Sequence, residues 1–324
     1  MSTNVITLEK PAAEKIVDRS KTRRRDHDNG WLFALPHLVL FAGFVVLPLV
    51  VGFYISLHHW TILQKFHPFI GLSNYRSALS DDIFWLALRN TVYFVILVVP
   101  ASNLVSLLLA LGLWKTRAFG AFYKAAFYTP VVVSIAVVAV LWQWLYDTQA
   151  GLINLVIQSW CTDLNRLGFH LPSFNGFPWL SDPHWIMPSL AVMSLWWGAG
   201  GNMIIYLAGL NNIPPDYYEA ARIDGASSWQ SFRAITWPLL RPTTLFCFIF
   251  SVIGAFQIFG QSYVLFGDGG GAGRAAMTLA VYMYQQGFSE FEIGYGNAVA
   301  YLLFLILMIV SAVQFGLLSR RGDQ

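Results

Sequence analysis

Six long apolar segments without a charged residue constrain this chain more than any other feature of its sequence. Each is at least as long as the roughly 20 residues that a helix needs to cross about 30 Å of hydrocarbon. Their apolar residues are continuous rather than alternating, which predicts membrane-spanning helices and not the strands of a membrane barrel. The segments are 31–57, 90–114, 125–146, 185–210, 243–266 and 294–319.

The composition agrees with an all-α integral membrane protein. Charged residues make up 11% of the 324 residues, whereas a soluble domain carries about 25%. The two cysteines, Cys161 and Cys247, are too few and too far apart for a disulfide framework or a metal site. None of the six lysines follows a glycine, so the chain lacks a phosphate-binding loop. We therefore expect no catalytic residue, cofactor or metal ion in this chain.

The positions of lysine and arginine predict the orientation. With a cytoplasmic N-terminus, fifteen of the twenty Lys and Arg residues lie inside and five outside, whereas the acidic residues divide almost evenly. Both termini are therefore expected in the cytoplasm. The predicted organisation is a basic cytoplasmic tail at 1–30, a first membrane helix at 31–57, an outer loop at 58–85, a core domain of five membrane helices at 86–316 and a cytoplasmic C-terminus at 317–324.

Two loops are long enough to carry structure of their own. The outer loop 147–184 is rich in Trp, Pro and Gly, and we expect short interfacial helices and turns on the outer membrane face. The cytoplasmic loop 211–241 is patterned. Pro214 and Pro215 can open a short helix there, and Gly225 can end it because glycine tolerates a left-handed conformation.

The rest of the cytoplasmic loop predicts a second helix and a docking surface. Ser227 or Ser228 can cap a helix that runs to Ile235, and Pro238 closes the unit before the next span. The first helix has only two to three turns, which is marginal in water, so it needs a groove to dock in. Its surface for that purpose combines two small side chains with apolar anchors, namely Ala220, Ala221, Tyr217, Tyr218 and Ile223.

Two stretches of this loop, Glu219-Ala-Ala-Arg-Ile-Asp-Gly-Ala226 and Ile235-Thr-Trp-Pro238, carry a family resemblance. They resemble the EAA loop in the permease subunits of binding-protein-dependent ABC importers, and specifically the carbohydrate-uptake branch of the maltose and glycerol-3-phosphate type. Gly71-Leu-Ser-Asn-Tyr75 and Gly151-Leu-Ile-Asn154 extend the resemblance over nearly the whole chain. The chain departs from the family at Trp237, where leucine is usual, and in the outer glycine run, which lacks a proline.

The resemblance implies a type I ABC importer permease fold with a cytoplasmic coupling helix, in a bacterial inner membrane. It implies that this chain is not an enzyme, and that two cytoplasmic ATPase subunits bind the ATP and Mg. Further implied partners are a second permease subunit, an extracytoplasmic solute-binding protein and membrane lipid, but no nucleic acid. The residues assigned to ATPase coupling by this resemblance are Glu219, Ala220, Ala221, Asp224 and Gly225.

A substrate path is suggested by amide and indole side chains in or near the spans. Amides bind hydroxyl groups and indole rings stack on sugar faces, so both suit a carbohydrate. The alternative for each residue is hydrogen bonding and packing between helices. The candidates are Asn103, Gln143, Trp196, Trp197, Asn202, Gln257 and Gln261.

Two other functions remain as alternatives. An ion-coupled secondary transporter of a small polar solute usually carries an ionisable residue in mid-membrane, and the six segments hold no Asp, Glu, Lys or Arg. A membrane-embedded enzyme would need a cluster of carboxylates or histidines at one membrane face, and none stands out. Neither alternative gives the EAA-like loop a role.

Overall fold

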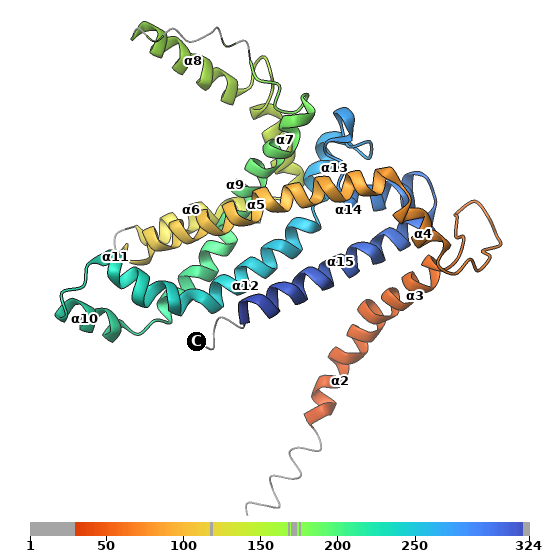
Figure 1. Ribbon diagram of the computed structural model, residues 1–324, viewed down its shortest axis with the longest axis horizontal. Helices are drawn as coiled ribbons and strands as arrows, with labels where there is room; N and C mark the ends of the chain where they lie inside the picture. The colour runs from red at the N-terminus through yellow and green to blue at the C-terminus, as the bar shows by residue number, and fades with distance from the viewer. Residues whose placement is uncertain (1–29, 117–118, 168, 170–173, 175, 320–324) are drawn as a thin grey trace, which may run out of the picture. The chain divides into compact units, whose positions relative to one another are not determined.

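The computed structural model describes residues 30–116, 119–167, 169, 174 and 176–319. The predicted tail at 1–30 lies outside the described residues except for Gly30, as does the C-terminal segment 317–324 except for 317–319. The chain divides into two compact units, 1–52 and 53–324. Helices dominate the described part of both units (Figure 1).

The described part of the first unit is an apolar helical stretch. It consists of α2 (Gly30–Phe41), the π-helical turn η1 (Ala42–Val46) and the first part of α3 (Leu47–Ser56). The side chains from Phe33 to Val51 are all exposed. A continuous apolar helical stretch of this length fits a membrane span, as predicted for 31–57.

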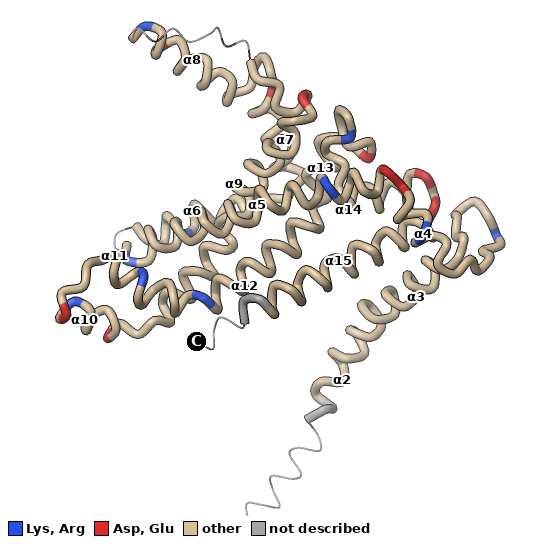
Figure 2. The backbone as a smooth tube through the Cα atoms, viewed as in Figure 1, with Lys and Arg blue, Asp and Glu red and all other residues tan. Residues whose placement is uncertain are grey.

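The second unit holds the remaining candidate spans. Within the described residues of the chain, five helical stretches are long and apolar enough to cross a membrane, and a sixth crossing exists if one bent helix pair counts as a span. Figure 2 shows long uncharged stretches of α5, α12 and α15. Three of the five stretches are the helices α5 (Asp82–Trp114), α9 (Pro183–Asn211) and α15 (Ile293–Ser319).

Both α5 and α9 start at an aspartate cap. The Oδ1 atom of Asp81 accepts from the backbone N–H of Ile83 at 2.8 Å, so α5 begins well before residue 90, where the apolar segment starts. Asp182 accepts in the same way from the backbone N–H of His184 at 2.9 Å. This bond, with a second one from the His184 ring, lowers the pKa of the Asp182 carboxyl.

The prediction of a continuous span at 125–146 is wrong in one respect, because the helix is broken and bent there. It consists of α6 (Gly120–Val132) and α7 (Ile135–Leu145), which meet at an angle of 97°. Val133 and Ser134 between them have extended backbone conformations. A proline and a run of β-branched valines precede the bend, and both weaken a helix at this point.

The predicted boundaries around the fifth span are also wrong. Pro238 does not close the loop, because α11 (Ser228–Ser231) continues through the π-helical turn η2 (Phe232–Thr236) into α12 (Trp237–Phe256). A π-helical turn carries the helix past a proline that cannot donate to the preceding turn. At the other end, residues 257–259 interrupt the helix before α13 (Gly260–Phe266).

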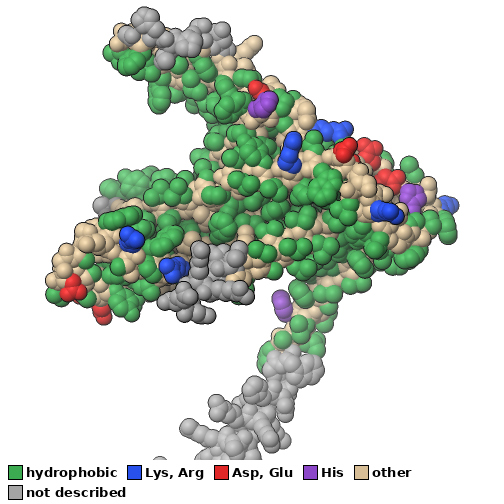
Figure 3. Space-filling model, in the orientation of Figure 1, with side chains coloured by type: hydrophobic (Ala, Val, Ile, Leu, Met, Phe, Trp, Pro, Cys, Tyr) green, Lys and Arg blue, Asp and Glu red, His purple; other side chains and the backbone are tan. Residues whose placement is uncertain are grey.

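Close packing of α6 on α9 depends on a glycine. A Cβ atom at Gly200 would lie 2.1 Å from the carbonyl oxygen of Phe127. Two clusters of buried apolar side chains complete the core, and the smaller one joins α5, α9 and α12 through Leu113, Tyr206 and Leu240. Apolar side chains also cover most of the face seen in Figure 3, as suits helices in lipid.

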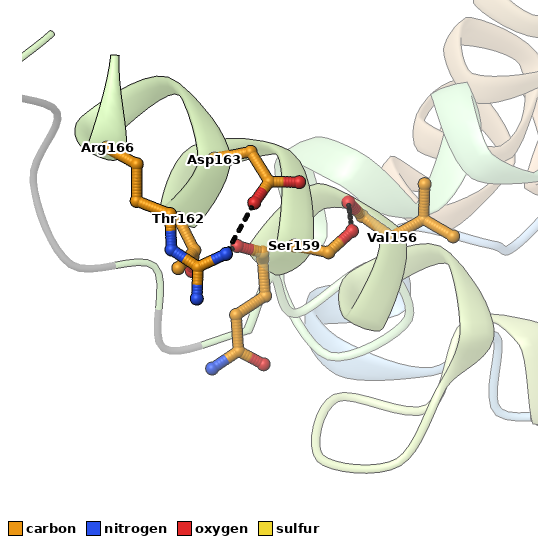
Figure 4. A network of polar contacts seen from close by, with 6 residues as sticks. Val156, Ser159, Thr162, Asp163 and Arg166 are labelled. Atoms are coloured by element: carbon orange, nitrogen blue, oxygen red, sulfur yellow. Dashed lines mark hydrogen bonds and ion pairs between the residues drawn. The ribbon is translucent and has the colours of Figure 1, made fainter. Parts of the chain in front are cut away.

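Short helices also lie between the long apolar stretches. These are α4 (Ser73–Leu79), α8 (Leu152–Arg166), η3 (Ala272–Arg274), α14 (Leu279–Tyr284) and η4 (Gln285–Ser289). Only α8 lies within the described residues of the loop 147–184, where the sequence predicts short interfacial helices. Buried Asn154 ties the loop around α8 together, since its amide accepts from Trp179 at 2.8 Å and donates to the Phe177 carbonyl at 3.1 Å. One side of α8 is polar, with an Arg166–Asp163 ion pair at 3.2 Å (Figure 4).

Candidate functional site

The helix predicted in the loop 211–241 is α10 (Pro215–Ile223), and its end has the geometry expected from the sequence. Gly225 has a φ of +76°. Its N–H donates to the Arg222 carbonyl at 3.1 Å, and the N–H of Ala226 donates to the Ala221 carbonyl at 2.8 Å. These two bonds form a Schellman motif, which fixes where α10 stops.

Hydrogen bonds also fix the start of the next helix. The Ser227 hydroxyl accepts from the N–H of Gln230 at 3.3 Å, and the Gln230 side chain accepts from the N–H of Ser227 at 2.7 Å. This reciprocal capping box starts α11. The prediction that Ser227 or Ser228 caps this helix is therefore confirmed for Ser227. The two caps make the segment from α10 to α11 a defined structure rather than a flexible loop.

The side chains of α10 are largely exposed. The helix has no buried residue, and the side chains of Tyr217 and Ile223 are 53% and 86% exposed. Four of the five residues predicted for coupling are exposed and the fifth, Ala221, is half-buried. A short helix with exposed aromatic and aliphatic side chains beside small alanines has a surface suited to a groove in another protein.

Tyr218 departs from the prediction that it anchors α10 in a partner. Its ring packs against Trp114 at the end of α5, with ring centroids 5.3 Å apart. Its hydroxyl lies 2.9 Å from the Thr236 hydroxyl. The Nζ atom of Lys115 lies 4.7 Å from the Trp114 ring centroid and 5.4 Å from that of Tyr218. Sequence reasoning missed Trp114 and Lys115, because nothing in their local pattern predicts a contact with a loop about a hundred residues away. It also missed the contact of Thr236 with Tyr218, 18 residues earlier in the same loop.

The residues predicted for a substrate path do not form one cluster. Asn103 and Asn202 are joined through the Ser251 hydroxyl, to which their amides donate at 3.2 and 2.9 Å. The buried Asn103 oxygen also accepts from Tyr206 at 3.1 Å. This network links α5, α9 and α12, which favours the interhelical alternative for both asparagines.

Two further candidates form hydrogen bonds beside the breaks in the helices. The Trp197 indole donates to the carbonyl of Val133 at 3.0 Å, at the bend between α6 and α7. The buried Gln261 amide donates to the Ser194 hydroxyl at 3.4 Å and so joins α13 to α9. Both therefore have structural partners.

The remaining three candidates are exposed and open to contact. Gln143 and Gln257 are exposed, and Gln257 lies at the break between α12 and α13. Trp196 is 44% exposed, and one side of its ring rests against Trp142 with centroids 5.9 Å apart. An exposed indole and exposed amides retain the chemistry that a polar solute needs.

A family model, described as the inner membrane component of binding-protein-dependent transport systems, matches residues 102–322 of this chain. A probable ABC transporter permease protein of Pyrococcus horikoshii is 35% identical over 279 residues, which cover 86% of this chain and 91% of that protein. The lactose transport system permease protein LacF of Rhizobium radiobacter is 31% identical over 92% of this chain and 96% of its own length.

Further matches come from a relative and from a solved structure. The arabinooligosaccharides transport system permease protein AraP of Bacillus subtilis is 32% identical over 89% of this chain and 87% of its own length. A chain in the crystal structure of a bacterial alginate ABC transporter with its periplasmic protein has a TM-score of 0.73 and 20% identity, and covers 94% of this chain and 99% of that chain. This match shows a shared fold, the type I importer permease fold expected from the sequence.

Proposed function

Because this chain belongs to the family of inner membrane components of binding-protein-dependent transport systems, we propose that it forms part of the pathway for a sugar or sugar-derived solute in an ATP-driven importer. An extracytoplasmic binding protein delivers the solute. The sugar class rests on relatives whose names include lactose and arabinooligosaccharide transport. Family membership also favours this function over ion-coupled transport by the chain alone.

The observation that carries the coupling part of the proposal is the rigid, bare helix α10. Its ends are fixed by the Schellman motif at Gly225 and the capping box at Ser227, while its outer face is exposed. Such a helix transmits a rigid-body push when it sits in a cleft of a partner. We assign docking on an ATPase subunit to Glu219, Ala220, Ala221 and Asp224, with Gly225 as the turn behind them.

The proposal includes a division of labour and an orientation. Two cytoplasmic ATPase subunits bind ATP and Mg, and a second permease subunit, a different chain, completes the pathway. Both termini of this chain lie in the cytoplasm, consistent with the bias of lysine and arginine towards that side. Exposed Gln143, Trp196 and Gln257 are the residues that we propose for solute contact.

A cross-linking experiment tests the coupling assignment. Ala220→Cys in the assembled transporter should cross-link to an ATPase subunit, whereas Ser159→Cys in α8 should not. Glu219→Lys should weaken association with the ATPase and reduce uptake, and Glu219→Gln, which removes the charge without reversing it, should be milder. Wild-type association and uptake in Glu219→Lys, without an Ala220 cross-link, would overturn the assignment.

A further inference from the structure

The side of α10 that faces its own chain is held in place at one residue. Within the part of the chain that the structure describes, Tyr218 is the residue of α10 whose side chain makes ring contacts and a side-chain hydrogen bond with the rest of the protein. Cavities of about 330 and 320 Å³ flank it, and both are lined by Trp114, Lys115, Tyr218 and Arg222. Elsewhere, therefore, this side of α10 is loosely packed.

The contacts of Tyr218 reach two different spans. Its ring meets Trp114, the last residue of α5, and Lys115 lies within about 6 Å of both ring centroids, the range in which a cation is attracted to an aromatic face. Its hydroxyl meets Thr236, the last residue of η2, directly before α12. Tyr218 also packs on the buried cluster that joins α5, α9 and α12.

We propose that Trp114, Lys115, Tyr218 and Thr236 form a clamp that passes displacement of α10 to the ends of α5 and α12. These are positioning residues, because they hold the docking helix to the spans and need not touch the ATPase or the solute. The inference rests on the proposed coupling role of α10. It adds the route by which a push on that helix enters the membrane-spanning part.

The clamp has two separable arms. The ring arm consists of Trp114, Lys115 and Tyr218 and leads to α5. The hydroxyl arm consists of Tyr218 and Thr236 and leads to α12. Tyr218→Leu removes both arms, whereas Tyr218→Phe and Thr236→Val remove only the hydroxyl arm. Lys115→Met removes the cation at similar length, and Lys115→Arg keeps a cation over the rings.

A distance measurement tests the rigid link directly. Spin labels at Asp216→Cys on α10 and Leu108→Cys on α5 are placed in the assembled transporter, with Cys161 and Cys247 replaced by serine. With the clamp intact, the distance between them should stay narrow and unchanged when ATP and vanadate trap the complex. In Tyr218→Leu the distribution should broaden or shift on trapping. An unchanged narrow distribution in Tyr218→Leu would overturn the proposal.

Turnover measurements supply the second readout. Tyr218→Leu and Lys115→Met should keep the ATPase subunits bound but lose at least about fivefold in the stimulation of ATP turnover by the binding protein, a typical size for coupling between sites. Lys115→Arg should restore the stimulation, and Lys124→Met, the same change on α6, should have no effect. The double variant of Lys115 and Tyr218 should be no worse than Tyr218→Leu alone, as expected for residues that act together.

The outcomes separate this inference from the proposed function. If Ala220→Cys does not cross-link to an ATPase subunit, the coupling role of α10 fails. If the cross-link forms but Tyr218→Leu and Lys115→Met retain wild-type stimulation, α10 couples by another route and only the clamp is wrong.

Discussion

At the scale of single residues, Gly225 has the clearest conformational requirement. Its φ of +76° belongs to the left-handed region, and no atom lies within 4 Å of an added Cβ. A substitution there therefore costs backbone strain and not a clash.

Gly225→Val should destabilise the end of α10 by about 1–3 kcal/mol, because a β-branched residue is strained at positive φ. Asparagine tolerates this region better, so Gly225→Asn should be milder. Uptake by membranes and hydrogen exchange of residues 221–226 measure the effect. Equal uptake in both variants and the wild type would show that the turn does not matter for coupling.

A second residue-scale prediction concerns the contact of α6 with α9. Gly200→Ala places a Cβ 2.1 Å from the backbone oxygen of Phe127, so the helices must separate. Gly201→Ala is the matched control, since nothing lies within 4 Å of its Cβ. Gly200→Ala should lower the melting temperature in detergent. Gly201→Ala should leave it unchanged or raise it, because alanine's higher helix propensity adds up to about 1 kcal/mol to the free energy of unfolding. Equal melting temperatures would contradict this packing.

At the scale of elements, the sequence predicts correctly the helix boundaries that depend on local residue preferences. The start of α10 at Pro215, its stop at Gly225 and the cap at Ser227 all follow from backbone preferences of the residues themselves. The six apolar segments likewise predicted where helices lie, since hydrophobic length is readable without tertiary information.

The breaks within two of the predicted spans could not be predicted from the sequence, because tertiary hydrogen bonds stabilise them. The bend after Val132 leaves the Val133 carbonyl free for the Trp197 indole, and the break after Phe256 leaves the Ile258 carbonyl free for the Thr278 hydroxyl, which donates at 2.8 Å. A broken helix is tolerated in a membrane when side chains satisfy the freed backbone groups. Those partners lie far along the chain, so the local sequence pattern predicts unbroken spans.

The amphipathic helix α8 yields an element-scale prediction. Val156, Trp160 and Leu164 lie on one side at helical spacing and are 42%, 68% and 40% exposed. The opposite side carries Ser159, Thr162 and Arg166 (Figure 4). A helix of this kind at an outer membrane face should place its apolar side among the lipid headgroups.

Because the chain contains 13 tryptophans, Trp160 is tested by difference. Trp160→Phe should remove part of the fluorescence that lipids brominated near the headgroup quench, compared with the wild type in the same vesicles. Trp144→Phe is the control for loss of another exposed tryptophan, one at the end of α7, and shows how far the same substitution outside α8 changes the quenching. If the shallow quencher affects Trp160→Phe and wild type equally, α8 does not lie in the interface.

At the scale of the whole molecule, family membership gives the inner membrane, and the charge distribution predicts the orientation of the chain in it. The family model describes an inner membrane component, and the lysine and arginine bias predicts that the loop containing α10 is in the cytoplasm. The loop that contains α8 is then expected outside. Coupling through α10 requires this arrangement, because ATP is hydrolysed in the cytoplasm.

Two exposed serines provide a matched test of that arrangement. In a chain with Cys161 and Cys247 replaced by serine, Ser159→Cys on α8 should react with a membrane-impermeant maleimide in right-side-out vesicles. Ser227→Cys, at the cap of α11, should react only after the vesicles are permeabilised. Both positions are exposed, so a difference in labelling reports the side of the membrane and not burial. The reverse pattern would place α10 outside, where no ATPase could reach it, and the coupling assignment would fall with the topology.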